Sequence, residues 1–329
     1  MKKKNNTKKL QIGLILLAIV CALIAGGLFL SSQKKKEHTA VTSGGDVQEL
    51  EDRTTITYEG KKYKYNRDLK NIVFLGVDKR DAVQVQEYPG RGGQSDAIMV
   101  LSMNKETKQT KVLQVSRDSM VDLKIYDAEG NFLAKEQGQL ALQYAYGDGE
   151  KKSCRLSRDA VSELLYGVPM SGFISLNMDG IVSIVDTLGG VPMTFSEDYA
   201  YVEPSYKQGA SVVLDGAAAE RFVRYRDSEQ LGSNNVRMAR QIEFLNAMLK
   251  TVKSYVQNES SYHQLLDSAS PYMVTDLKAD EMQTLSSYEM EEPIYKVPGE
   301  TVVGEEHDEY QVDEEGLKKL IIELFYLPA

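Results

Sequence analysis

The longest apolar segment of the chain is Leu10–Leu30 (LQIGLILLAIVCALIAGGLFL), which contains no charged residue. A helix of this length spans about 30 Å, the hydrocarbon thickness of a bilayer. Five lysines precede the segment, which favours a cytoplasmic N-terminus. A cleaved signal peptide has a shorter apolar region of about 7–15 residues and a cleavage site of small residues, which is absent here. We therefore predict one transmembrane signal-anchor helix over residues 10–30, a cytoplasmic tail over residues 1–9 and an extracellular remainder.

The pattern beyond the anchor predicts a stalk followed by short strands. Residues 31–54 are polar and rich in Lys, Glu, Ser, Thr and Gly, which is typical of a flexible linker. Residues 55–65 alternate around Glu59-Gly60 and predict a hairpin, so that residues 31–66 form a stalk and a short hairpin. Apolar runs then predict strands over Asn71–Val77, Ala97–Met103, Lys111–Val115, Val191–Phe195 and Ile294–Val297.

Helical periodicity and capping residues predict the remaining elements. The longest predicted helix runs from Asn235 as its N-cap to about Val256, with apolar residues at 4-3-4-3 spacing. Ser157 and Asp215 are predicted as N-caps of shorter helices, and Gly167 as the end of the first of these. The shorter helices are predicted over residues 157–166, 179–188, 215–225, 279–288 and 314–326.

These elements define the expected fold class. Strands and helices follow one another without a strict βαβ rhythm, which predicts an α/β fold, an α-β-α sandwich around a mixed central sheet. No break in composition is strong enough to divide the extracellular part. We assign residues 67–257 to the domain that carries the chemistry, and residues 258–329 to C-terminal helices and a strand that complete the same domain.

The charge of the chain becomes informative once it is divided. The 329 residues have a formal net charge of −9. Residues 1–36 contain eight lysines and no acid, so the remainder, with 31 basic and 48 acidic residues, has a net charge of −17. This acidity argues against a nonspecific nucleic-acid partner. The three histidines are far apart in sequence, which argues against zinc chemistry, and Cys154 is the only cysteine beyond the anchor.

Acidic residues lie at the ends of the first two predicted strands of the sheet: Asp78 follows the strand Asn71–Val77, and Asp96 precedes the strand Ala97–Met103. A turn centred between residues 106 and 107 gives paired residue numbers that sum to 213, so that Asp96 faces Arg117. If the strand before Asp78 is antiparallel to the next strand, Asp78 lies at the same edge of the sheet. Paired carboxylates suit Mg²⁺, which prefers oxygen ligands and is often bound by protein carboxylates together with substrate phosphates. The alternative is a surface ion pair in ordinary strand-end loops.

A second cluster joins the end of one predicted helix to the start of the longest one. A helix N-terminus is the positive end of the helix dipole, so arginines there are unfavourable unless an anion or nearby acids such as Asp227 and Glu229 neutralise them. Guanidinium groups match phosphate oxygens with paired hydrogen bonds, so the cluster predicts a phosphate site. Its members are Arg224, Arg226, Arg237, Arg240 and Gln241.

No sequence motif points to another chemistry. The chain contains no Walker loop, no G-x-G-x-x-G, no G-x-S-x-G and no persuasive Ser/His/Asp set. Arginines together with metal-binding carboxylates favour phosphoryl chemistry by positioning and charge neutralisation.

Five stretches carry a resemblance to a known family. They are NIVFLGVDKRD (Asn71–Asp81), QSDAIMVLSMNKETKQTKVLQVSRD (Gln94–Asp118), LQYAYGDG (Leu142–Gly149), FISLNMDGIVSIVDTLGGV (Phe173–Val191) and LDGAAAERFVRYRD…VRMARQIEFL (Leu214–Leu245). In this order they resemble the LytR-CpsA-Psr (LCP) family of bacterial cell-envelope proteins, over about residues 70–257.

The resemblance implies an extracellular phosphotransferase that moves a glycopolymer, of wall teichoic acid or capsular type, from an undecaprenyl-pyrophosphate carrier to peptidoglycan. It implies a location at the cell membrane of a Gram-positive-type envelope. Asp78 and Asp96 would hold Mg²⁺ (or Mn²⁺), and Arg117 and Asp118 would be catalytic. The implied pyrophosphate-binding residues are Arg80, Arg117, Arg224, Arg226, Arg237 and Gln241.

The chain departs from the family pattern at two positions, and alternative functions stay open. Gln94 stands where Arg is usual, with Arg91 as a substitute three residues earlier, and Ser116 stands where Pro is usual. Apolar residues at 181–185 and 244–248 either line a tunnel for a lipid tail or belong to an ordinary core. The other functions are a pyrophosphatase that uses water as acceptor and a non-catalytic regulator that binds polyprenyl phosphates or wall polymers.

Overall fold

The computed structural model describes residues 55–127, 129–225, 233–278, 281, 288–291, 293–304 and 307–329. The predicted anchor and stalk lie outside these residues, as do Arg226 and most of the helix predicted over residues 279–288. Among the described residues, no helix is both long and apolar enough to cross a membrane.

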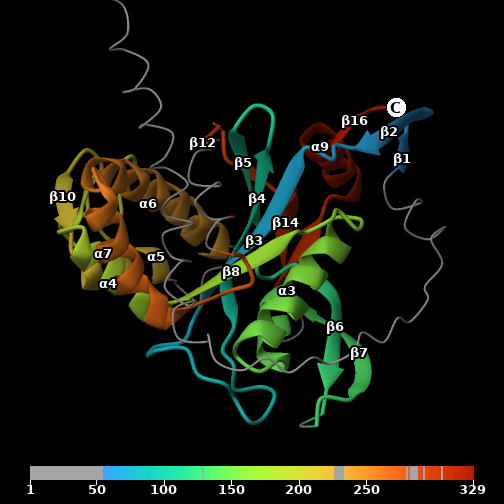
Figure 1. Ribbon diagram of the computed structural model, residues 1–329, viewed down its shortest axis with the longest axis horizontal. Coiled ribbons are helices and arrows are strands. Elements are labelled where there is room, and N and C mark those ends of the chain that lie inside the picture. The colour runs from blue at the N-terminus through green and yellow to red at the C-terminus, as the bar shows by residue number, and fades with distance from the viewer. Residues whose placement is uncertain are drawn as a thin grey trace, which may run out of the picture.

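A seven-stranded mixed sheet forms the centre of the molecule (Figure 1). The order is β11-β8-β3-β4-β5-β12, and β13 also pairs with β5. β3 is antiparallel to β4 and parallel to β8, and β4 is antiparallel to β5. This confirms the predicted mixed sheet. The strands are β3 (Leu69–Val77), β4 (Ser95–Asn104), β5 (Gln109–Val115), β8 (Gly172–Asn177), β11 (Met273–Thr275), β12 (Glu289–Met290) and β13 (Tyr295–Lys296).

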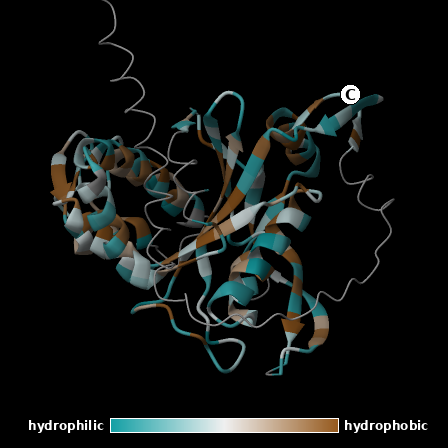
Figure 2. Ribbon diagram, in the orientation of Figure 1, coloured by the Kyte–Doolittle hydropathy of each residue, from teal (hydrophilic) through white to brown (hydrophobic). Residues whose placement is uncertain are grey.

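Helices cover both faces of this sheet. Alternate residues of β3 enter different cores: Val73 and Leu75 pack with α3 and α9, whereas Ile72 packs with α4, α6 and α7. Burial on both faces explains why these strands are continuous apolar runs (Figure 2). The helices are α3 (Lys151–Leu164), α4 (Met178–Thr187), α6 (Ser233–Tyr255), α7 (Glu259–Ala269) and α9 (Glu314–Phe325).

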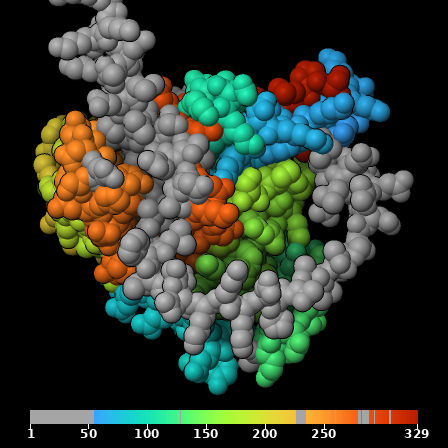
Figure 3. Space-filling model, in the orientation of Figure 1, coloured from blue at the N-terminus to red at the C-terminus, as the bar shows by residue number. Residues whose placement is uncertain are grey.

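Smaller elements surround the sandwich. A third core lies between α4, α6, the β9–β10 hairpin and α5, whose N-cap Asp215 accepts from the amide of Ala218 as predicted. β16 pairs with β2, so the C-terminus lies beside the N-terminal hairpin (Figure 3). The remaining elements are β1 (Thr55–Tyr58), β2 (Lys61–Tyr65), β6 (Met120–Tyr126), β7 (Phe132–Gln139), η2 (Leu140–Tyr146), β9 (Val191–Thr194), β10 (Ser211–Leu214), α5 (Gly216–Arg224), η3 (Ser270–Tyr272), β14 (Gly299–Val303), β15 (Asp308–Val312) and β16 (Tyr326–Pro328).

The predicted start of the helix at Ser157 is wrong. α3 begins six residues earlier, at Lys151, because the carboxylate of Asp148 accepts hydrogen bonds from the amides of Glu150, Lys152 and Ser153. Ser157 is instead a buried residue inside the helix. α6 likewise begins at Ser233, two residues before the predicted Asn235 cap.

This correction predicts opposite behaviour for two substitutions. Asp148→Ala leaves three helix amides without their acceptor and should lower the free energy of unfolding by about 1–2 kcal/mol. Ser157→Ala should change it by about 0.5 kcal/mol or less, since the hydroxyl oxygen of Ser157 is buried without a hydrogen-bond partner among the described residues. Urea unfolding of both variants measures the difference, and a larger loss for Ser157→Ala would contradict the assigned helix start.

Candidate functional site

One edge of the central sheet brings together the residues predicted from strand register. β4 and β5 pair with residue numbers that sum to 213, as in Leu101 with Val112, which confirms the predicted turn. Beyond the last pair, Arg117 Nη1 lies 2.5 Å from Asp96 Oδ1. Asp78 directly follows β3 at the same edge, because β3 is antiparallel to β4. The predicted contact between Asp96 and Arg117 is confirmed.

A β-bulge determines where Asp96 points. Gly76 pairs with Ala97 and Val77 pairs with Ser95, so Asp96 is an extra residue on β4 with no partner of its own on β3. Bulges of this kind bend a strand and re-aim a side chain. Gly76 permits the close approach, since a Cβ there would lie 3.0 Å from the Cβ of Ala97.

Asp96 lies between two arginines. Its Oδ1 contacts Arg117 and its Oδ2 lies 3.1 Å from Nη1 of Arg237, which comes from α6. The three side chains are 14%, 11% and 4% exposed, respectively. Arg237 therefore belongs with the carboxylates rather than with Arg224, and it connects α6 to the edge of the sheet.

Further contacts orient Arg117. Its Nη2 donates to Oε1 of Gln94 at 2.5 Å, and its Nε lies 3.4 Å from Oδ1 of Asp118. Asp118 is buried and accepts at 3.1 Å from Nε2 of Gln139, which also donates to the carbonyl of Asp308. Gln139 was not predicted, because residues at the end of β7 and in β15 carry no local pattern that relates them to Arg117.

The two departures from the family pattern both take part in this arrangement. Gln94 supplies an acceptor to Arg117. The hydroxyl of Ser116 accepts from the amide of Asp118 at 3.3 Å and so supports the turn that presents Arg117.

A second group of arginines lies around Glu220 of α5. Arg80 Nη2 is 2.5 Å and Arg224 Nη1 is 3.5 Å from the same oxygen, Oε1 of Glu220. Arg80 Nη1 also lies 3.3 Å from Asp179. Arg80 and Arg224, both among the pyrophosphate-binding residues that the resemblance implies, therefore meet at Glu220. Glu220 was not predicted, although its i, i+4 spacing from Arg224 is a local signal for an ion pair.

Two predicted members of the arginine cluster serve the packing of α6 against α5. Gln241 donates to the carbonyl of Val223 at 3.3 Å. Arg240 is buried and donates to the carbonyls of Phe222 and Tyr225 at the C-terminal end of α5. These carbonyls are the negative end of a helix dipole, so Arg240 is neutralised without a bound anion.

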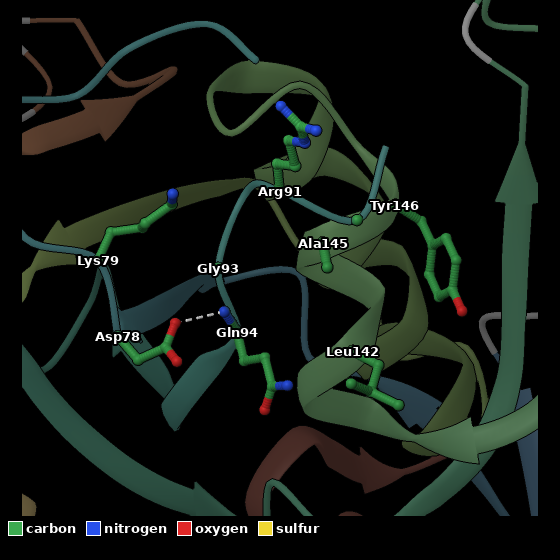
Figure 4. Close-up of a pocket in the computed structure, with 9 residues that line it drawn as sticks. Asp78, Lys79, Arg91, Gly93, Gln94, Leu142, Ala145 and Tyr146 are labelled. Atoms are coloured by element: carbon green, nitrogen blue, oxygen red, sulfur yellow. Dashed lines mark hydrogen bonds between the residues drawn. The ribbon is translucent and has the colours of Figure 1, made fainter. Parts of the chain in front are cut away.

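A cavity of about 380 Å³ adjoins Asp78 (Figure 4). Asp78 Oδ1 accepts from the amide of Gln94 at 2.6 Å at its wall. Arg91 also lines the cavity, but its side chain points away from Asp78 and Gln94 (Figure 4). It lies over the ring of Tyr88. The cavity is lined by Asp78, Lys79, Gly90, Arg91, Gly93, Gln94, Leu142, Ala145 and Tyr146.

Glycine is required at one point of the cavity wall. Gly93 has a φ of +88°, and a Cβ there would lie 2.8 Å from Oδ1 of Asp78. A smaller cavity of about 170 Å³ is lined by Arg80 and shares Lys79 with the first. The loop after β3 therefore links the Asp78 cavity to the arginines around Glu220.

The carboxylates at this edge retain capacity for a cation. Each oxygen of Asp96 contacts one arginine, and Asp78 accepts one amide on Oδ1, whereas a carboxylate offers about four acceptor sites. Among the described residues, no group of three or more His, Cys, Asp or Glu side chains has metal-site geometry. The donors present fit a hard cation that takes its other ligands from water and substrate.

The fold and these residues define a class: an α/β protein with a mixed sheet that gathers paired arginines and carboxylates at one edge, suited to phosphate groups. A model of the LytR_cpsA_psr family matches residues 28–324, so the chain belongs to that family.

Relatives and solved structures agree with this family. The chain is 29% identical over 250 residues to the polyisoprenyl-teichoic acid–peptidoglycan teichoic acid transferase TagU of Enterococcus faecalis, covering 73% of this chain and 74% of that one. Protein gbs0355 of Streptococcus agalactiae has a TM-score of 0.62 at 21% identity, covering 78% and 86% of the two chains. TagT bound to LI-WTA has a TM-score of 0.57 at 21% identity, covering 78% and 90%. The two structures support the fold.

The contrast in burial between Arg237 and Arg224 predicts different costs of removal. Arg237→Ala leaves Asp96, whose side chain is 14% exposed, with one partner fewer and should lower the free energy of unfolding by about 2–3 kcal/mol. Arg224→Ala removes a side chain that is 52% exposed, and exposed ion pairs are worth about 0–1 kcal/mol. Urea unfolding measures both, and equal losses would show that Asp96 does not depend on Arg237.

Proposed function

We propose that this chain is an extracellular phosphotransferase that moves a glycopolymer from a polyprenyl-pyrophosphate carrier to peptidoglycan. The observation that carries the proposal is Asp96 held between Arg117 and Arg237, with Arg117 bonded to Gln94 in the wall of the cavity that Asp78 also lines. The name of the Enterococcus faecalis relative, a teichoic acid transferase that acts on peptidoglycan, supports this reaction.

The charge balance of the site favours a bound divalent cation. Four carboxylates contact the four arginines, so the arginine charge is compensated before a substrate arrives: Asp96 and Asp118 contact Arg117, Asp96 also contacts Arg237, Glu220 contacts Arg80 and Arg224, and Asp179 also contacts Arg80. A pyrophosphate diester brings two further negative charges. Mg²⁺ or Mn²⁺ held by Asp78 and Asp96 would supply the missing positive charge and polarise the phosphate oxygens.

The reaction requires one bond to form and one to break. A peptidoglycan hydroxyl attacks the phosphorus that carries the glycopolymer, the bridging P–O bond breaks, and polyprenyl phosphate departs with the electron pair and takes up the proton of the hydroxyl. Arg117 and Arg237 neutralise charge that grows on the phosphate oxygens. Asp118 lies against Arg117 rather than the cavity, so we assign it to positioning Arg117.

The predicted anchor places this chemistry at the outer face of the membrane. A signal-anchor helix over residues 10–30 would retain the chain beside a lipid-linked donor, and the described domain would extend toward the wall. Glycopolymer carrier and peptidoglycan are then the two partners.

A transfer assay tests the proposal. The full-length protein is incubated with a labelled lipid-pyrophosphate sugar, Mg²⁺ and peptidoglycan oligomers, and products are identified by mass spectrometry. Arg117→Ala should lower the transfer rate about 10²–10³-fold, the cost typical of removing one transition-state donor. Asp78→Asn should lower it as strongly and raise the Mg²⁺ concentration needed.

The matched control is Asp159→Asn, an exposed acid on α3 paired with the neighbouring Arg158, which should keep full activity. Full activity in Arg117→Ala and Asp78→Asn would refute the catalytic assignment. Release of sugar phosphate without transfer would identify a pyrophosphatase, and binding without any product would identify a regulator.

A further inference from the structure

Glu220 is a buried acid that contacts two arginines, where the negative charge could otherwise come from a bound substrate. Its side chain is 11% exposed, whereas those of Arg80 and Arg224 are 55% and 52% exposed. Both arginines approach the same oxygen, Oε1 of Glu220. The carboxylate is therefore the fixed member of the group, and the two long side chains converge on it.

The backbone of α5 fixes Glu220. Asp215 caps the helix, and the amide of Gly216 donates to Asp186 of α4 at 2.8 Å. The two helices touch at this point, since a Cβ on Gly216 would lie 2.6 Å from the carbonyl oxygen of Val182. Glu220 stands one turn further along this anchored helix, so its Cα is fixed, and the burial of its side chain limits how far the carboxylate can follow the arginines into solvent.

Two guanidinium groups do not stay together without an anion. Arg80 belongs to the loop after β3 and Arg224 to the end of α5, and like charges at short range repel. Arg80 is held on a second side by Asp179. Among the described contacts, Glu220 is the carboxylate that both arginines share, so it holds them side by side before any phosphate is bound.

This arrangement leaves donors for a ligand. A guanidinium has five N–H donors in a planar fork. The contacts given above use Nη1 and Nη2 of Arg80 and Nη1 of Arg224, and half of each arginine side chain remains exposed. Some N–H donors of Arg80 and Arg224 thus contact Glu220 and Asp179, and the remaining donors are available to one ligand.

We infer that Glu220 is a positioning residue that pre-orients Arg80 and Arg224 for the pyrophosphate of the substrate. The inference rests on the proposed function, because it assigns a ligand to these arginines. Pre-orientation lowers the entropy that two long side chains lose on binding, so it acts on substrate affinity more than on the chemical step.

The test compares Glu220→Gln with wild type in steady-state transfer by the full-length protein. Glutamine keeps the shape and removes the charge that holds both arginines. We expect KM for the lipid-pyrophosphate donor to rise about 10-fold while kcat stays within about two-fold. Glu220→Asp, which keeps the charge, should recover part of the affinity, and it decides the question if the glutamine variant does not fold.

The control is Glu163→Gln, which removes the charge of an acid on α3 that pairs with a single cation, Lys124, away from the site. Its KM should equal that of wild type. An unchanged KM in Glu220→Gln would overturn the inference, because it would show that Glu220 has no effect on donor binding. A lowered KM would overturn it by making Glu220 a competitor of the substrate.

A second measurement separates this inference from the proposed function. The ¹⁵Nε–H signals of Arg80 and Arg224 report side-chain order in the absence of substrate, and we expect them to lose order in Glu220→Gln but not in Glu163→Gln. No transfer by the wild type would refute the proposed function alone. Unchanged order of both arginines in Glu220→Gln would refute the positioning role whether or not the protein transfers polymer.

Discussion

The buried contact of Asp96 with Arg117 and Arg237 is the constraint on which the site depends. A carboxylate with only 14% of its side chain exposed is unfavourable unless it is paired, and here each oxygen has its own guanidinium partner. Meeting this requirement fixes three separate parts of the chain: the bulge that aims Asp96, the turn after β5 that carries Arg117, and the first part of α6 that carries Arg237. The geometry of the sheet edge therefore also sets the position of α6 over the second core.

The same electrostatic logic explains Arg240, which contacts no carboxylate among the described residues. Arg240 stands near the start of α6, where a helix dipole disfavours cations, yet it is bound to carbonyls at the end of α5 and lies against the rings of Tyr201 and Tyr225. An arginine near a helix N-terminus thus indicates an anion only when no C-terminal helix end lies close to it. The C-terminal end of α5 comes close to Arg240 only through tertiary packing. The sequence pattern alone therefore does not predict that Arg240 contacts carbonyls whereas Arg237 contacts Asp96.

Local sequence pattern predicts much of the fold. It predicts only those contacts of the site that form between segments close in sequence. The apolar runs predict β3, β4 and β5, and the length of one turn predicts the contact of Asp96 with Arg117. The predicted start of α3 is wrong because Ser157 is a residue type that favours N-caps. The start is instead set by Asp148, which lies two residues before the N-cap residue and accepts hydrogen bonds from three amides. Gln139 was missed because its role depends on β7 and β15 meeting beside Asp118, a contact between distant segments.

The two arginine groups differ in a way that suits different tasks. Arg237 is buried, the side chain of Arg117 is 11% exposed, and both contact Asp96, so their donors are fixed in direction and their charge is felt in a medium of low polarity. Arg80 and Arg224 are half exposed and share Glu220, and Arg80 also contacts Asp179, so their exposed halves can meet a ligand that arrives from solvent. A fixed pair favours stabilisation of charge during reaction, whereas an accessible pair favours capture of the donor. Lys79 lines both cavities and Arg80 lines the second one, so the loop after β3 joins the Asp78 cavity to the accessible pair.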